Sequence, residues 1–82
     1  MEKAQITYIG KYLKNLEETL YSDKYSKIAM QAELPNLYQN IKLLMDETFK
    51  TEDQKLKPLL AYMEMRMRKC KQYMEEKLGV RN

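Results

Sequence analysis

The chain has 82 residues, with two glycines, two prolines, one cysteine, no histidine and a formal net charge of +3. This length allows one domain, residues 1–82, and so few turn residues disfavour a β-rich fold. The absence of histidine excludes His-based acid–base catalysis, a Ser–His–Asp triad and a carboxylate–histidine metal centre. We therefore expect a small all-α protein that is not an enzyme, with no catalytic residues, no cofactor and no metal.

The first predicted helix covers residues 2–21. Its apolar residues recur at intervals of three and four, which places them on one face of an amphipathic helix. These residues are Ile6, Ile9, Leu13, Leu16 and Leu20. Tyr8 and Tyr12 flank this apolar face.

The second helical segment is expected to begin at Ser22 or Asp23, because either side chain can cap a helix N-terminus. Four residues before the proline share one face: Tyr25, Ile28, Ala29 and Ala32. Pro35 lacks the N–H that would bond the carbonyl of Gln31, and the apolar stripe shifts phase near Leu34. The sequence therefore predicts either two short helices or one bent helix. After Pro35 the stripe continues with Leu37, Tyr38, Ile41, Leu44, Met45, Thr48 and Phe49.

The third helix is predicted to follow a capping box at residues 51–54, with Thr51 as N-cap and Gln54 bonding back to it. Pro58 is expected to kink its first turns, and Gly79 stands where a helix C-cap is expected. Residues 80–82 are expected to fray. Short connections between these segments predict a small antiparallel bundle of three to four helices.

The third helix carries the most regular apolar stripe in the chain, which we call the seam. The seam consists of Leu56, Leu60, Met63, Met67, Cys70 and Met74. Its alternating four- and three-residue spacing is typical of a helix packed lengthwise against other helices. The sequence leaves open whether the seam closes within one chain or between two copies, so dimerisation could complete the bundle.

Cys70 is expected to be a small buried hydrophobe because it belongs to the seam. The alternative is a thiol made reactive by its neighbours Lys69 and Lys71. A single cysteine, no apolar N-terminal run and no segment long enough to cross a bilayer are typical of a cytoplasmic protein.

The third helix also holds the excess positive charge, because charges in residues 1–50 balance. Tyr62, Arg66, Lys69 and Tyr73 are spaced 4-3-4 and share one face beside the seam. Cations interleaved with aromatic rings suit an anionic partner, although such a face can also be merely solvated. The predicted partner-binding residues are Tyr62, Met65, Arg66, Arg68, Lys69 and Tyr73, with Tyr8 and Tyr12 as further contacts.

Our first hypothesis is a small helical protein that binds a larger protein through an acidic patch on that partner, and so inhibits or tethers it. The alternative is a nucleic-acid-binding homodimer joined along the seam, with the basic faces of both copies aligned. Membrane-surface association of the basic helix is a third option, which the acidic residues on the other segments disfavour.

Overall fold

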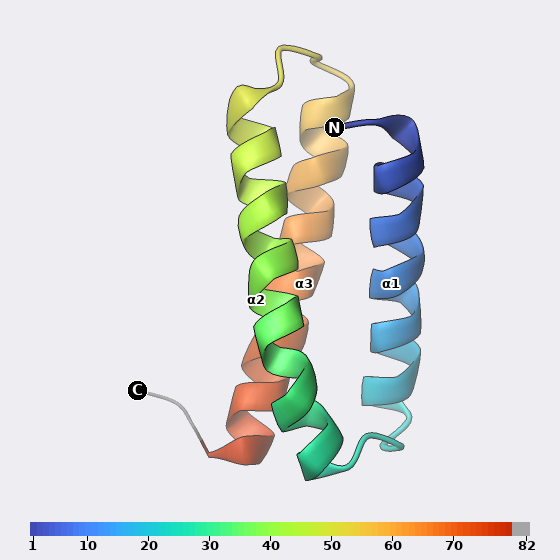
Figure 1. Cartoon of the computed structure of the whole chain (residues 1–82), viewed down its shortest axis with the longest axis vertical. Coiled ribbons are helices and arrows are strands. Elements are labelled where there is room, and N and C mark those ends of the chain that lie inside the picture. The colour runs from blue at the N-terminus through green and yellow to red at the C-terminus, as the bar shows by residue number, and fades with distance from the viewer. Residues whose placement is uncertain (80–82) are drawn as a thin grey trace.

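The computed structural model describes residues 1–79 and contains three α-helices. They are α1 (Lys3–Tyr21), α2 (Lys27–Lys50) and α3 (Leu56–Leu78). α1 and α3 run in the same direction, and α2 runs antiparallel to both (Figure 1). The described residues contain no strand, which confirms the predicted all-α fold with the smaller of the two expected helix numbers. The predicted frayed end, residues 80–82, lies outside the described residues.

A single core of fourteen buried residues, all apolar, joins the three helices. α1 contributes Ile9, Leu13, Leu16 and Leu20, which are the predicted stripe without Ile6 at its margin. α3 contributes five of the six seam residues, each at most 4% exposed, and Leu56 packs at the edge. The seam therefore closes within one chain. A homodimer that paired two copies of it would first have to open the bundle.

α2 is one continuous helix through Pro35, so of the two alternatives that the sequence left open, that of two short helices is excluded. Its buried stripe keeps one phase on both sides of the proline and consists of Met30, Leu34, Leu37, Ile41 and Leu44. The predicted phase shift arose from placing Ile28 and Ala32 on the core face before the proline, whereas both are exposed, Ile28 at 83%. Phe49, also placed on the apolar stripe, is 90% exposed. Pro35 itself is exposed, so the backbone bond that it removes lies on the solvent side of the helix, where water can bond the free carbonyl.

The start of α2 lies later than predicted. Ser26 is the N-cap, because its hydroxyl accepts a hydrogen bond from the N–H of Ala29 at 3.1 Å. Ser22 instead ends α1, and Asp23 adopts a positive φ of 61° in the connecting turn. Aspartate tolerates this left-handed conformation better than most residues, which suits it to a turn rather than to the predicted cap.

The predicted cap at Thr51 was also wrong, although an aspartate within the predicted box performs that role. Thr51 is the C-cap of α2. The Asp53 carboxylate accepts hydrogen bonds from the N–H groups of Lys55 at 2.9 Å and Leu56 at 3.2 Å, and its carbonyl accepts from Lys57 at 3.0 Å. This is the bonding of an N-cap. At the other end of α3, Gly79 has a φ of 71° and confirms the predicted C-cap.

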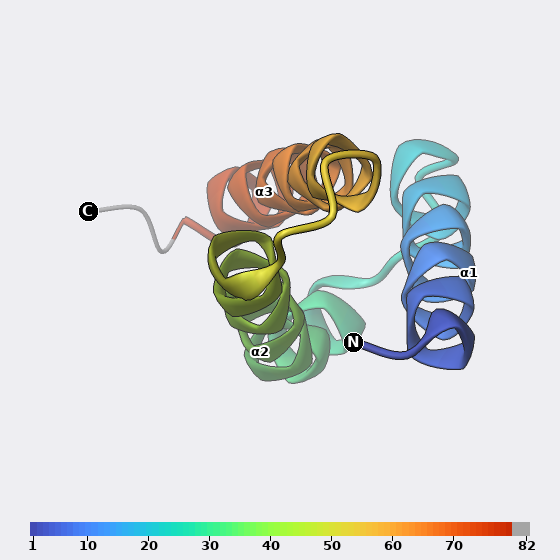
Figure 2. The same cartoon turned by 90° about the horizontal axis from the view of Figure 1, so that it is seen from above.

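The three helices do not pack equally. α3 packs closely against α2 and less extensively against α1, whereas the backbones of α1 and α2 approach each other at few points. Seen from above, α1 and α2 stand apart, and α3 covers one side of both (Figure 2). The Cα extents are 38 × 26 × 16 Å. The backbones of α1 and α2 are the least closely packed pair in the bundle. None of the three described helices combines the length and apolarity needed to span a bilayer.

Candidate functional site

The predicted partner-binding face on α3 is partly occupied by contacts within the chain. Arg66 forms a bidentate ion pair with Glu17 of α1, with its Nε 3.1 Å from a carboxylate oxygen. Tyr73 packs edge-on against Tyr21 of α1, with 5.5 Å between the ring centroids. Hydrogen bonding to Glu17 raises the pKa of the Arg66 guanidinium. These two residues therefore hold α3 against α1.

The remaining cations of the basic run face other neighbours. Arg68 pairs with Glu64 at 2.7 Å, and its second guanidinium nitrogen lies 2.8 Å from the sulfur of Met45 on α2. Lys71 pairs with Glu75 at 3.2 Å. Lys69 is exposed and makes no ion pair among residues 1–79. Three of the four cations are thus compensated by carboxylates of the same chain.

The six predicted contact residues divide between sides of α3: Tyr62, Arg66, Lys69 and Tyr73 share one face as expected, whereas Met65 and Arg68 lie on other sides. Arg66 and Tyr73 lie toward α1, and Arg68 lies toward α2. Met65, 48% exposed, lies on the side of α3 opposite the seam. Tyr62 is 53% exposed, and the Arg66 guanidinium lies over its ring at 5.4 Å.

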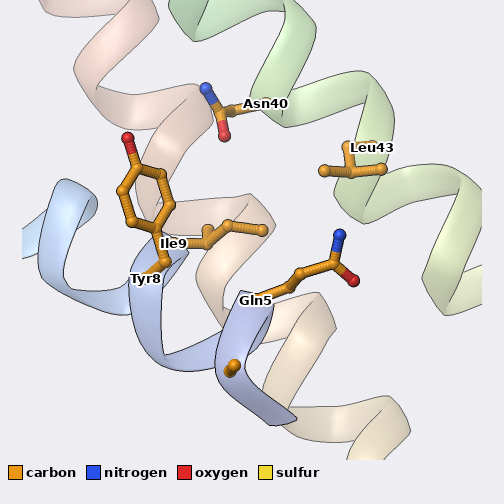
Figure 3. A pocket seen from close by; sticks show the side chains of 6 residues that line it. Gln5, Tyr8, Ile9, Asn40 and Leu43 are labelled. Carbon is orange, nitrogen blue, oxygen red and sulfur yellow. The ribbon is translucent and has the colours of Figure 1, made fainter. Parts of the chain in front are cut away.

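A different feature stands out where α1 and α2 separate. Three adjoining pockets follow one another between these helices, and we call them together the α1–α2 groove. The first has a volume of about 360 Å³ and is lined by Ala4, Gln5, Tyr8, Ile9, Asn40 and Leu43 (Figure 3). Side chains from the two helices face each other across it. The second, also about 360 Å³, is lined by Tyr8, Tyr12, Asn36, Gln39, Asn40 and Leu43.

The third pocket extends the groove toward the loop between α1 and α2. It has a volume of about 160 Å³ and is lined by Tyr12, Asn15, Leu16, Thr19, Tyr25 and Glu33. Adjacent pockets share lining residues, so the groove is continuous along most of α1. From residue 4 to residue 19, a rise of 1.5 Å per residue gives a length of about 22 Å.

The chemistry of the groove differs from that of the chain as a whole. Fourteen residues line the three pockets, and Glu33 is the only charged one among them, although 33% of all residues are charged. The others are apolar residues, three tyrosines, one threonine and five amides. Depletion of charge together with enrichment in aromatic residues is typical of the centre of a protein–protein interface.

Glu33 is held in place by two hydrogen bonds to the same carboxylate oxygen. That oxygen accepts from the Tyr12 hydroxyl at 2.5 Å and from the Asn36 amide at 2.8 Å. Burial, and then the hydrogen bond to the Glu33 carboxylate, raise the pKa of Tyr12 far above its usual value. Burial and the nearby Glu33 charge also raise the pKa of Tyr25. The Glu33 carboxylate therefore lies close enough to both Tyr12 and Tyr25 to raise their pKa values.

The described residues contain no cluster of three or more His, Cys, Asp or Glu residues that could hold a metal ion. Cys70 is buried in the core, as expected for a small apolar residue of the seam, and burial raises the pKa of its thiol. Its neighbours Lys69 and Lys71 do not reverse that effect.

Of the fourteen residues that line the groove, the sequence predicted a binding role only for Tyr8 and Tyr12, and only as further contacts. A signal for the rest was present in the first helix. The spacing of residues 4, 8, 12, 15 and 19 is helical, and all five side chains are uncharged: Ala4, Tyr8, Tyr12, Asn15 and Thr19. An uncharged stripe beside the apolar stripe indicates a second surface that differs from an ordinary charged, solvated helix face.

The comparisons with known proteins add no relative to this picture. Neither the protein-family models, nor the curated proteins, nor the solved structures with which the chain was compared gave a match.

Proposed function

We propose that the chain is a non-enzymatic interaction protein that binds an α-helix of a larger protein in the α1–α2 groove, and so regulates or tethers that partner. The observation that carries this proposal is the chemistry of the groove wall, where one residue of fourteen is charged. An ordinary solvated face of this chain would carry several charges. The groove wall instead resembles the centre of an interface.

The shape of the groove supports a helix as the occupant. Its length of about 22 Å corresponds to about four helical turns. Two antiparallel helices border it, and the third helix packs against both of them, as in a four-helix bundle that lacks one member. Recognition of an amphipathic helix in such a groove relies on apolar anchors spaced by three and four residues. The five amides of the wall can bond polar groups at the margins of that helix.

An anionic partner on α3, as the sequence suggested, is less well supported by the structure. An acidic patch or a phosphate would compete with Glu17 for Arg66 and with Glu64 for Arg68. Charges already paired with neighbours add little affinity, because the internal pair is lost when the external one forms.

Nucleic-acid binding remains the second candidate. The exposed Tyr62 ring with its stacked Arg66 supports it, together with the neighbouring Lys69, which makes no ion pair among residues 1–79. Fluorescence anisotropy with labelled single- and double-stranded DNA and RNA tests this candidate. Phosphate contacts would give affinity that weakens steeply between low and physiological salt. No binding at low salt would exclude it.

Two matched lysine substitutions distinguish the groove from the α3 face. Leu43→Lys places a charge in the groove at a position that is 40% exposed, and Met65→Lys places the same charge on α3 at 48% exposure. Neither site is in the core, so both variants should fold. Partner capture from cells of the source, compared between the two variants, is the readout. Loss with Leu43→Lys alone supports the groove, whereas loss with Met65→Lys alone contradicts it.

A further inference from the structure

The third pocket of the α1–α2 groove contains the only charged residue of the groove wall. Glu33 of α2 and Tyr12 of α1 meet there through a hydrogen bond, and Tyr25 contributes from the loop that precedes α2. All three side chains are partly buried. The pocket therefore combines a fixed carboxylate with two aromatic rings at one end of an otherwise neutral groove.

This combination selects for a cation. Both hydrogen bonds to Glu33 end on Oε2, and among the described residues Oε1 accepts no hydrogen bond. An ionised carboxylate oxygen bonds well to an ammonium or guanidinium group, and tyrosine rings attract the same cations through their faces. The carboxylate repels an acidic group. The pocket has a volume of about 160 Å³ and opens to the surface, so the end of a lysine or arginine side chain can enter it.

We propose that this pocket receives a lysine or arginine side chain presented by the helix of the protein partner. The inference rests on the proposed function, because it names the chemistry of the helix that occupies the groove. A single charge contact at one end, with neutral contacts along the rest, would fix the register and direction of that helix. Charge pairs contribute in this way to specificity more than to total affinity.

The experiment selects helices that bind the full chain and then examines their chemistry. A displayed library of 16-residue helical peptides, randomised on one face, is selected against the wild-type chain. The best binders are measured by calorimetry on the wild type, Leu43→Lys, Glu33→Gln and Glu18→Gln. Glutamine keeps an oxygen that can accept the Tyr12 hydrogen bond, so Glu33→Gln removes the charge with little change in shape. Glu18 is an exposed carboxylate away from the groove and serves as the matched control.

The proposal predicts that selected helices share a lysine or arginine at one position. Replacing it with norleucine should weaken binding to the wild type and to Glu18→Gln about tenfold, and to Glu33→Gln less than about twofold. Helices that bind, are blocked by Leu43→Lys and show no such coupling would overturn this inference and leave the groove function standing. Binding that Leu43→Lys does not affect, or no binder at all, would overturn both.

Discussion

Removing the side chain of Met67 tests whether the seam belongs to a monomeric core. Met67 is fully buried near the middle of α3, whereas Met65, two residues away, is 48% exposed. The same substitution at both positions, Met67→Ala and Met65→Ala, therefore compares one residue type in and out of the core.

The expected magnitude follows from burial. Truncating a buried methionine to alanine costs about 2–5 kcal/mol through lost burial and the cavity that remains. A core of this size supplies about 3–5 kcal/mol, so Met67→Ala should remove most of the free energy of unfolding. Met65→Ala should change it by less than about 0.5 kcal/mol.

Urea denaturation followed by circular dichroism measures both variants, and protein concentration provides the decisive control. A monomer unfolds at the same urea concentration whatever the protein concentration. A dimer joined along the seam would gain about 2.8 kcal/mol over a hundredfold increase in concentration. A midpoint that rises with concentration, or equal losses at Met65 and Met67, would refute the monomeric core. If Met67→Ala does not fold, the concentration series on the wild type gives the same answer.

Two further predictions concern the ends of α3 and the effect of pH. Asp53→Ala should lower the free energy of unfolding by about 1 kcal/mol in urea, and Thr51→Ala by clearly less, because the carboxylate of Asp53 accepts hydrogen bonds from the N–H groups of Lys55 and Leu56 at the start of α3. Equal losses would contradict the assignment of this cap. The pKa values of Cys70 and Tyr12 are raised from 9.0 and 10.0, so the folded chain keeps protons that the unfolded chain releases. The contribution of these two groups to the free energy of unfolding should be constant below those ordinary pKa values and should fall as pH rises above them. Urea midpoints measured across this pH range should decline less steeply in Tyr12→Phe than in the wild type. An equally steep decline in both proteins would contradict the contribution of Tyr12.

The periodic parts of the fold were predictable because burial imposes a regular spacing on the sequence. The stripes of the first and third helices have uninterrupted three- and four-residue spacing, and the structure buries nearly all of their members. α2 was harder to read because it has apolar residues on several faces. Ile28 and Phe49 look like core residues by composition, and only the packing of α3 on the other face shows that they are exposed.

The candidate site could be predicted only in part, because it depends on which helices fail to pack together. Periodicity places Tyr8 and Tyr12 beside the apolar face of the first helix, but it does not show that α2 stands away from them. It likewise shows the positive run on the third helix without showing its carboxylate partners. Glu17 is 49 residues from Arg66 in the sequence, and nothing local connects them.

The most direct test of the account is site-specific photo-crosslinking in cells of the source. Tyr8 is 71% exposed on the wall of the groove, and p-benzoylphenylalanine resembles tyrosine enough to replace it there. The same amino acid at Met65 reports on the far side of α3. The account predicts an adduct with a protein partner from position 8, lost with Leu43→Lys, and none from position 65. An adduct only from position 65, or none from position 8, would contradict the claim that the groove binds the partner.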